Sequence, residues 1–330
     1  MRAKGTEALG FTLADFETAA AAFSGILSPT PQISWPLLNQ RCGCEVWVKH
    51  ENHLPTGSFK LRGGIWYTEK MLKSRNGSNG VIAATRGNHG QSVALSALSY
   101  RIPASVVVPF GNSIEKNRAM VAYGAKLIQF GTDFDDSLQR AYQLASERDL
   151  SFFPSFHPLL VQGVGTYAIE FFRGAPDLHT VYVPIGLGSG ICGMIAARNA
   201  LNLQTDIVGV VAEKAPAYAL SFARGKSIDT KSSGTIADGL AVRKPHPAAL
   251  EFILNGASRI VAVTEKQILD AIGFLFRDTH NIAEGAGAGP LAALLKEREN
   301  MQGRRVGLVL SGGNIDWELF LCANEQASTS

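Results

Sequence analysis

Several features that mark large protein classes are missing from this sequence. It has four cysteines in 330 residues, and Cys42 and Cys44 stand too close together for a strain-free disulfide. These cysteines therefore predict neither a disulfide framework nor a zinc site, and they are typical of a chain whose thiols stay reduced. No apolar run approaches the roughly 20 residues of a membrane helix, and the first residues contain no signal-peptide core. We therefore expect a cytoplasmic protein with no membrane partner.

The sequence also lacks a strong charge of either sign. Its 31 Lys and Arg residues nearly balance its 28 Asp and Glu residues, and no Lys/Arg-rich run occurs. This balance argues against a nucleic-acid partner. The chain is 46% hydrophobic and 18% charged, as is typical of a soluble globular enzyme or binding protein. Its length exceeds that of one ordinary core, which favours two domains.

Short β-branched segments alternate with amphipathic segments along most of the chain. The predicted strands cover residues 45–49, 81–84, 105–109, 126–130, 181–185, 207–212, 260–263 and 306–310. The predicted helices cover residues 59–72, 89–100, 113–123, 134–148, 161–172, 191–202, 217–224, 264–276 and 289–299. Most of these strands are apolar almost throughout, as strands buried on both faces of a parallel sheet must be. The alternation predicts an α/β doubly wound fold.

The segment Pro55-Thr-Gly-Ser-Phe-Lys60 joins the first predicted strand to the first predicted helix. Its first four residues predict a turn followed by a helix N-cap. Lys60 then lies in the first turn of a helix, where unpaired backbone amides and the positive end of the helix dipole disfavour an ammonium. A neutral amine at that place could form a Schiff base. Taken alone, the same pattern also fits a surface lysine at the start of a helix.

Three glycine-rich loops follow predicted strands, where open α/β sheets bind ligands. The loop at residues 84–90, Ala-Thr-Arg-Gly-Asn-His-Gly, offers backbone amides at a helix start and suits a carboxylate. The loop at residues 186–193, Gly-Leu-Gly-Ser-Gly-Ile-Cys-Gly, would let backbone amides approach a phosphate. The third loop, at residues 310–314, reads Leu-Ser-Gly-Gly-Asn and follows the last strand.

The second of these loops has other readings. Gly188 to Gly193 satisfies the G-x-G-x-x-G pattern, and Glu213 follows the next strand at about the spacing of a ribose-binding acid. A nicotinamide-dinucleotide enzyme of the Rossmann type is therefore a competitor from another enzyme class. A glycine loop that only allows close packing of a helix on a sheet is a third interpretation. Walker-type phosphate binding is excluded, because no Gly-Lys-Ser/Thr follows.

Taken together and in this order, the Lys60 turn and the three loops resemble one family from about residue 36 to residue 314. The chain resembles the fold-type II pyridoxal-phosphate enzymes, within the threonine/serine dehydratase and serine racemase group. The resemblance implies a tryptophan-synthase-β-like fold, with two open doubly wound sheets and pyridoxal 5'-phosphate between them. It implies a large domain made of residues 1–67 and 159–330, a small domain made of residues 68–158, and a homodimer.

The resemblance also implies roles for individual residues. Lys60 would be the Schiff-base lysine and the catalytic base. The cofactor would be held by Phe59, Lys60, Asn88, Gly186, Gly188, Ser189, Gly190, Glu284 and Ser311, and the substrate by Thr85, Arg86, Asn88 and His89. In this arrangement Ser311 would contact the pyridine nitrogen. A neutral hydroxyl at that position favours β-elimination over transamination.

The implied function is an ammonia-lyase that converts a β-hydroxy amino acid, such as L-threonine or L-serine, into a 2-oxo acid and ammonia. Arg86 departs from the family, because racemases carry a serine there as their second acid/base, so racemisation is disfavoured. Arg86 could face solvent, pair with an acidic residue, or contact a larger or more acidic substrate, such as 3-hydroxyaspartate or a hydroxyectoine-derived compound. Ala219 stands where metal-activated members carry an acid, so we expect no metal there.

Overall fold

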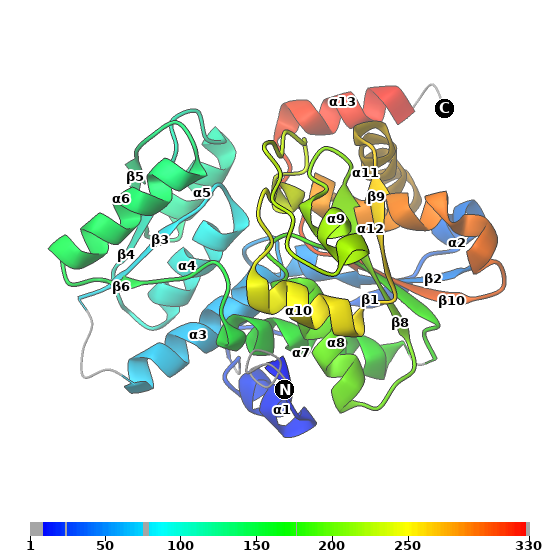
Figure 1. Ribbon diagram of the computed structural model, residues 1–330, viewed down its shortest axis with the longest axis horizontal. Helices are drawn as coiled ribbons and strands as arrows, with labels where there is room; N and C mark the ends of the chain where they lie inside the picture. Colours follow the sequence, from blue (N-terminus) through cyan, green and yellow to red (C-terminus); the bar gives the residue numbers. More distant parts are fainter. Residues whose placement is uncertain (1–8, 24, 75–78, 176, 328–330) are drawn as a thin grey trace.

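The structure is a computed structural model that describes residues 9–23, 25–74, 79–175 and 177–327. Figure 1 shows two β-sheets side by side, each covered by helices, with α3 (Lys60–Ser74) crossing between them. Residues 1–7, which predict no signal-peptide core, lie outside the described residues.

The larger sheet has six strands in the order β1-β2-β10-β7-β8-β9. The edge strand β1 pairs antiparallel with β2, and all the other neighbours pair parallel. The smaller sheet has four parallel strands in the order β5-β4-β3-β6. The strands are β1 (Gln32–Ser34), β2 (Glu45–His50), β3 (Val81–Ala84), β4 (Ala104–Val108), β5 (Lys126–Gln129), β6 (Ser151–Phe152), β7 (Thr180–Pro184), β8 (Asp206–Ala212), β9 (Arg259–Val263) and β10 (Arg305–Leu310).

Helices cover both faces of each sheet, which explains why the strands are apolar throughout. On β8, Val208 and Val210 belong to one hydrophobic cluster, whereas Ile207 and Val211 belong to another. The first cluster includes side chains from α2, α11 and α12, and the second includes side chains from α1, α7, α8 and α10. In the smaller sheet, α4 and α5 pack on one face and α6 packs on the other. The doubly wound prediction is confirmed for both sheets.

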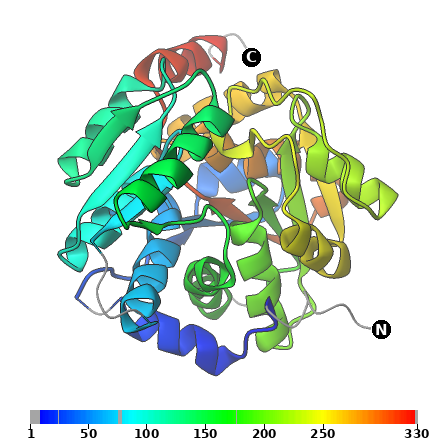
Figure 2. The ribbon, with the colours of Figure 1, turned by 60° about the vertical axis from the view of Figure 1, so that its left-hand side comes forward.

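The helix bounds are as follows. They are α1 (Leu13–Ala21), α2 (Pro36–Cys42), α3 (Lys60–Ser74), α4 (Asn88–Ser99), α5 (Ile114–Ala122), α6 (Phe134–Glu147), α7 (Pro158–Gly174), α8 (Ser189–Ala200), α9 (Ala217–Arg224), α10 (Pro247–Gly256), α11 (Glu265–Thr279), α12 (Gly285–Lys296) and α13 (Trp317–Ala327), with short 3-10 helices at Glu51–His53, Asp238–Leu240 and Arg298–Met301. Figure 2 shows α13, in red, next to the cyan and green elements of the smaller sheet.

The prediction of an N-cap before α3 is wrong. The helix begins at Lys60, one residue later than the predicted start, and Ser58 pairs instead with Gly312 in an isolated antiparallel bridge. The buried Ser58 hydroxyl has no hydrogen-bond partner within the described part of the chain. The turn itself is present, since Gly57 has a φ of 65° in the left-handed region that glycine adopts without strain.

The four strands of the smaller sheet lie within residues 68–158, and α3 runs across the predicted boundary at residues 67 and 68. The exact domain boundaries therefore stay a prediction. All four cysteines are free. None of the helices that the structure describes has the length and apolar character of a membrane span.

Candidate active site

The Lys60 turn and the loop after β10 are joined by backbone hydrogen bonds. Phe59 N–H donates to the carbonyl of Ser311 at 3.0 Å, and Gly313 N–H donates to the carbonyl of Gly57 at 2.9 Å. Together with the bridge between Ser58 and Gly312, these bonds bring the first helical residue next to the end of β10. Lys60 and Ser311, which are far apart in the sequence, therefore lie close together.

The amine of Lys60 lies in a desolvated environment. Burial lowers the pKa of Lys60 to about 8, and the nearby Glu284 carboxylate opposes this shift only in part. Its Nζ atom is 5.1 Å from the centre of the Phe59 ring. It forms no hydrogen bond with any other described residue. A substantial fraction of this amine is therefore neutral near pH 7 to 8 and free to react.

Hydrogen bonds connect three polar side chains, those of Asn88, Glu284 and Asn314. Asn88, at the start of α4, donates from Nδ2 to Glu284 Oε1 at 2.7 Å. Asn314 donates from Nδ2 to Asn88 Oδ1 at 2.8 Å and to the carbonyl of Thr56 at the same distance. Burial raises the pKa of Glu284 to about 7, despite the opposing effects of Lys116, Asn88 and Lys60. Near neutral pH this carboxyl can therefore hold or release a proton.

The loop after β7 places uncapped backbone amides near Phe59. Gly188 is the N-cap of α8, has a φ of 107° and receives no side-chain capping bond. A Cβ atom there would lie 2.6 Å from that of Ala249, so no larger residue fits. Tyr167 donates from its hydroxyl to the carbonyl of Gly190 at 3.0 Å and packs edge-on against Phe59. The first amides of α8 are free to bind an anion such as phosphate.

Ser189 is buried at the first position of α8, and Gly186 lies close to another segment. A Cβ atom on Gly186 would meet the carbonyl oxygen of Gly239 at 2.5 Å. In the same way, a Cβ atom on Gly239 would lie 4.0 Å from Glu284 Oε1. The segment around Gly239 therefore lies between the second loop and Glu284.

The loop after β3 presents a second helix start to the same region. Thr85 is buried and its hydroxyl accepts a hydrogen bond from Gly87 N–H at 3.0 Å. His89 Nε2 is buried and has no partner among the residues that the structure describes. Burial and, to a smaller extent, the charge of Lys60 lower the pKa of His89 to about 3, so the imidazole is neutral. Arg86 is exposed and forms no ion pair or hydrogen bond with any described residue.

Two residues at this place were missed by the sequence analysis. Lys116 of α5 donates to Asp238 Oδ2 at 2.8 Å, and it is only 8% exposed. Its side chain packs over Gly87, where an added Cβ would meet Lys116 Cδ at 3.1 Å. A cavity of about 30 Å³ lies among Lys116, Asp238 and Glu284. The position of Lys116 near the start of the helix after β4 could have marked it, whereas nothing in the sequence marks Asp238, which begins a short 3-10 helix between α9 and α10.

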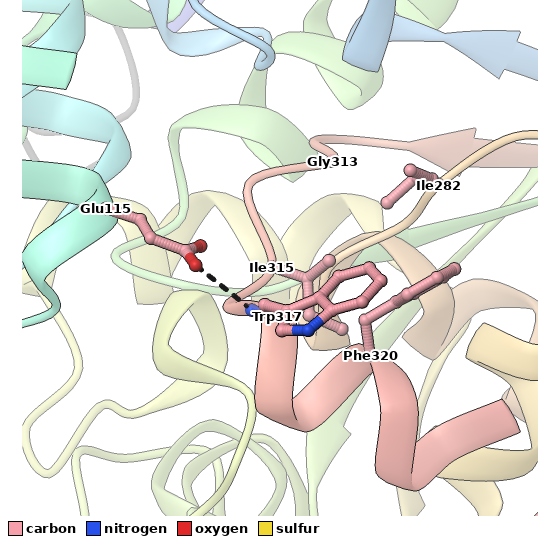
Figure 3. A pocket seen from close by; sticks show the side chains of 6 residues that line it. All are labelled: Glu115, Ile282, Gly313, Ile315, Trp317 and Phe320. Atoms are coloured by element: carbon pink, nitrogen blue, oxygen red, sulfur yellow. Dashed lines mark hydrogen bonds between the residues drawn. The ribbon is translucent and has the colours of Figure 1, made fainter. Parts of the chain in front are cut away.

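A larger cavity of about 220 Å³ lies beside the third loop (Figure 3). Figure 3 shows the rings of Trp317 and Phe320 on α13 next to each other, and a hydrogen bond from the backbone N–H of Trp317 to the carboxylate of Glu115. The cavity is lined by Glu115, Ile282, Gly313, Ile315, Trp317 and Phe320. Only Gly313 among them belongs to the loops described above, so this cavity adjoins the candidate site without being part of it.

The residues at the site fit pyridoxal phosphate. A half-buried amine with a lowered pKa suits the aldehyde, an uncapped glycine-bounded helix start suits the phosphate, and the buried Ser311 and the half-buried Asn88 offer polar atoms to a ring. Phe59 supplies an aromatic wall between the amine and Gly190, since an added Cβ at Gly190 would lie 3.6 Å from its ring. The fold and the site together define a fold-type II pyridoxal-phosphate enzyme with a tryptophan-synthase-β-like architecture.

Comparison with protein families identifies the chain more closely. A family model described as pyridoxal-phosphate dependent enzyme matches residues 23–312, and the chain belongs to this family. The chain is 35% identical over 306 residues to an L-threonine ammonia-lyase of Thermotoga maritima, covering 92% of this chain and 76% of that protein. It is 30% identical over 310 residues to the L-threo-3-hydroxyaspartate ammonia-lyase of Saccharomyces cerevisiae, covering 94% and 95% of the two chains.

Solved structures show the same fold over nearly the whole chain. Maize serine racemase aligns with a TM-score of 0.89 at 25% identity, covering 97% of this chain and 98% of that chain. The processed form of threonine deaminase isoform 2 from Solanum lycopersicum aligns with a TM-score of 0.87 at 26% identity, covering 97% and 95%. Within the described residues, no group of three His, Cys, Asp or Glu side chains could hold a metal ion. The expectation of no metal near Ala219 stays a prediction.

Proposed function

We propose that this chain catalyses β-elimination of a β-hydroxy α-amino acid and releases a 2-oxo acid and ammonia. The observation that carries the proposal is Lys60, a half-buried amine with its pKa lowered by desolvation to about 8 and no hydrogen-bond partner for its Nζ atom among the described residues. The named activities of the relatives support it, since L-threonine and L-threo-3-hydroxyaspartate ammonia-lyases both match this chain at 30% identity or more.

In this proposal, the amine of Lys60 would hold pyridoxal phosphate, which would supply an electron sink that makes the substrate α-proton acidic. Lys60 Nζ would be the base that takes the α-proton. The phosphate would be held by Gly186, Gly188, Ser189 and Gly190, and the ring by Phe59, Asn88, Glu284 and Ser311. Thr85, Asn88 and the neutral His89 orient the substrate carboxylate at the start of α4.

Racemisation needs a second acid/base on the opposite face of the substrate, and Arg86 is poorly suited to that role. A guanidinium stays protonated at any accessible pH, so it cannot exchange a proton as a serine hydroxyl can. Ser311 would offer the pyridine nitrogen a neutral hydroxyl, which would leave that nitrogen unprotonated and weaken transamination. Elimination is therefore favoured, although the fold is shared with serine racemase.

The proposal is tested with the purified protein, pyridoxal phosphate and a panel of L-threonine, L-serine and 3-hydroxyaspartate. We expect a 2-oxo acid and ammonia in equal amounts. Borohydride should fix the cofactor on the peptide that contains Lys60. Lys60→Ala should reduce turnover to below about a thousandth of the parent rate, which corresponds to about 4 kcal/mol. Lys70→Ala is the matched control, because Lys70 lies on the same helix and its Nζ packs over Trp66 instead.

Substantial turnover in Lys60→Ala would remove Lys60 from the role of base. The nicotinamide alternative predicts a colourless protein that binds NAD at residues 188–193, and family membership gives it no support. A homodimer and a cytoplasmic location stay predictions; sedimentation that shows a monomer at micromolar concentration would contradict the first.

A further inference from the structure

Two cationic side chains adjoin the loop that receives the substrate carboxylate. Lys116 packs over Gly87, and Arg86 precedes Gly87 directly. Lys116 is paired with Asp238 at 2.8 Å. Burial lowers the pKa of Lys116, but Asp238, Glu284 and Asp316 raise it by more. Lys116 therefore stays protonated, and the Asp238 carboxylate balances its charge. Arg86, in contrast, is exposed and forms no ion pair with any described residue.

The substrate α-carboxylate does not require Arg86. Gly87 is the N-cap of α4 and receives no side-chain capping bond, so the first amides of the helix can bind an anion. The buried and unpaired His89 Nε2 is a further polar atom at the same helix turn. A helix start with these donors satisfies one carboxylate, and an unpaired guanidinium beside it is excess positive charge. Such a charge is stabilised by a second anion.

From this juxtaposition we infer that Arg86 determines specificity for a substrate with a second acidic group. The substrate class is a β-hydroxy α-amino dicarboxylic acid, of which 3-hydroxyaspartate is the smallest member. A guanidinium matches a carboxylate in a bidentate geometry that threonine and serine cannot use. The same charge repels a diamino acid. This inference rests on the proposed function, because it names the substrate class of the same site.

The reaction on this substrate balances without another reactant. The Cα–H bond breaks and its proton goes to Lys60, the Cβ–O bond breaks, and the hydroxyl leaves as water after taking up a proton. Water then adds back as the enamine hydrolyses. The products are oxaloacetate and ammonia, whereas threonine gives 2-oxobutanoate and ammonia.

The test compares Arg86→Gln with the parent holoenzyme on 3-hydroxyaspartate and on L-threonine. We expect the ratio of kcat/KM for 3-hydroxyaspartate to that for threonine to fall by about 30-fold or more, as a lost charge-assisted contact would predict. Oxaloacetate and 2-oxobutanoate are measured separately. Arg118→Gln is the control, since Arg118 is another exposed arginine, on α5, and it should leave the ratio within about twofold.

A second measurement does not depend on turnover. L-aspartate and L-alanine carry no β-hydroxyl, and calorimetry gives their affinities for the holoenzyme. Arg86→Gln should weaken binding of L-aspartate at least tenfold relative to L-alanine. An unchanged ratio in both experiments would overturn the inference while leaving the elimination activity established. Absence of 2-oxo acid from every substrate would instead overturn the proposed function.

Discussion

Replacing Glu51 with glutamine is expected to destabilise the fold strongly, because Glu51 belongs to a largely buried four-charge cluster that includes Arg62 in the first turn of α3. The cluster consists of Lys49, Glu51, Arg62 and Glu170. Arg62 Nε lies 2.7 Å from Glu51 Oε2, Arg62 Nη1 lies 2.7 Å from Glu170 Oε1, and Lys49 Nζ lies 2.6 Å from Glu170 Oε2. The side chains of Lys49, Glu51 and Arg62 are at most 1% exposed.

The magnitude follows from the charge balance. Two cations face two carboxylates in the parent, whereas Glu51→Gln leaves both cations with Glu170 alone. The carboxylate also accepts hydrogen bonds from Arg62 Nη2 at 2.9 Å and from Thr30 Oγ1 at 2.6 Å, and an amide cannot replace all of them. Breaking one member of a buried ionic group costs about 3–5 kcal/mol. The hydrogen bonds are part of this figure and are not added to it.

The assay is urea unfolding followed by far-ultraviolet circular dichroism, at neutral pH and at saturating cofactor for both proteins, because bound ligand shifts the apparent stability. The matched control is Glu17→Gln. Glu17 pairs with Arg173 at 2.8 Å, and the two side chains are 55% and 54% exposed. That substitution should cost less than about 1 kcal/mol.

A double variant tests the charge argument itself. Arg62→Met alone leaves an excess carboxylate, but combined with Glu51→Gln it leaves Lys49 with Glu170, which is neutral. The combined cost should therefore fall about 1–3 kcal/mol below the sum of the two single costs. A loss below about 1 kcal/mol for Glu51→Gln, or additive costs in the double variant, would refute the reasoning.

Two further predictions concern the site. Because burial lowers the pKa of Lys60 to about 8, the rate at which cofactor-free protein takes up pyridoxal phosphate should rise with pH and reach half its maximum near that value. Glu284→Gln removes the charge that opposes the shift and should lower this midpoint; a midpoint at the ordinary lysine pKa would contradict the assignment. Gly188→Ala should weaken cofactor binding about tenfold or more, because its φ is 107° and the added Cβ would lie 2.6 Å from Ala249. Gly225→Ala, at a φ of 65° with nothing within 4 Å, is the control in an equilibrium binding titration.

The sequence predicts the sheets well because their strands are buried on both faces and read as apolar runs. It misses β1 and β6, which have three and two residues and are too short to show a pattern. The helices α1, α2, α10 and α13 are missed too. The predicted helix at residues 264–276 is confirmed as α11, and Thr264 and Gln267 make both bonds of a capping box at its start. The N-cap before α3 fails because pairing of Ser58 with Gly312 overrides the local preference of serine.

At the site too, the sequence reveals local patterns but not contacts between residues that are far apart in the chain. Each of the four motifs is a local signal, so its residues are found from the sequence. Contacts between distant segments cannot be found in this way: Asn88 and Glu284 are 196 positions apart, and Lys116 and Asp238 are 122 apart. No spacing rule reaches across such distances. The unpaired state of Arg86 is likewise visible only once its neighbours are placed.

The four-charge cluster also bears on the chemistry of Lys60. Arg62 lies on α3 two residues after Lys60, and an unpaired guanidinium at that distance would disfavour a second cation. Glu51 and Glu170 neutralise Arg62 and Lys49, so the cluster adds little net field at the amine. The causes of the lowered Lys60 pKa are accordingly burial and, in opposition, Glu284. The cluster therefore stabilises the start of α3 through Arg62. The protonation of Lys60 is determined mainly by its burial and not by the cluster. A substitution that unbalances the cluster is therefore expected to change both the stability and the pH dependence of the site.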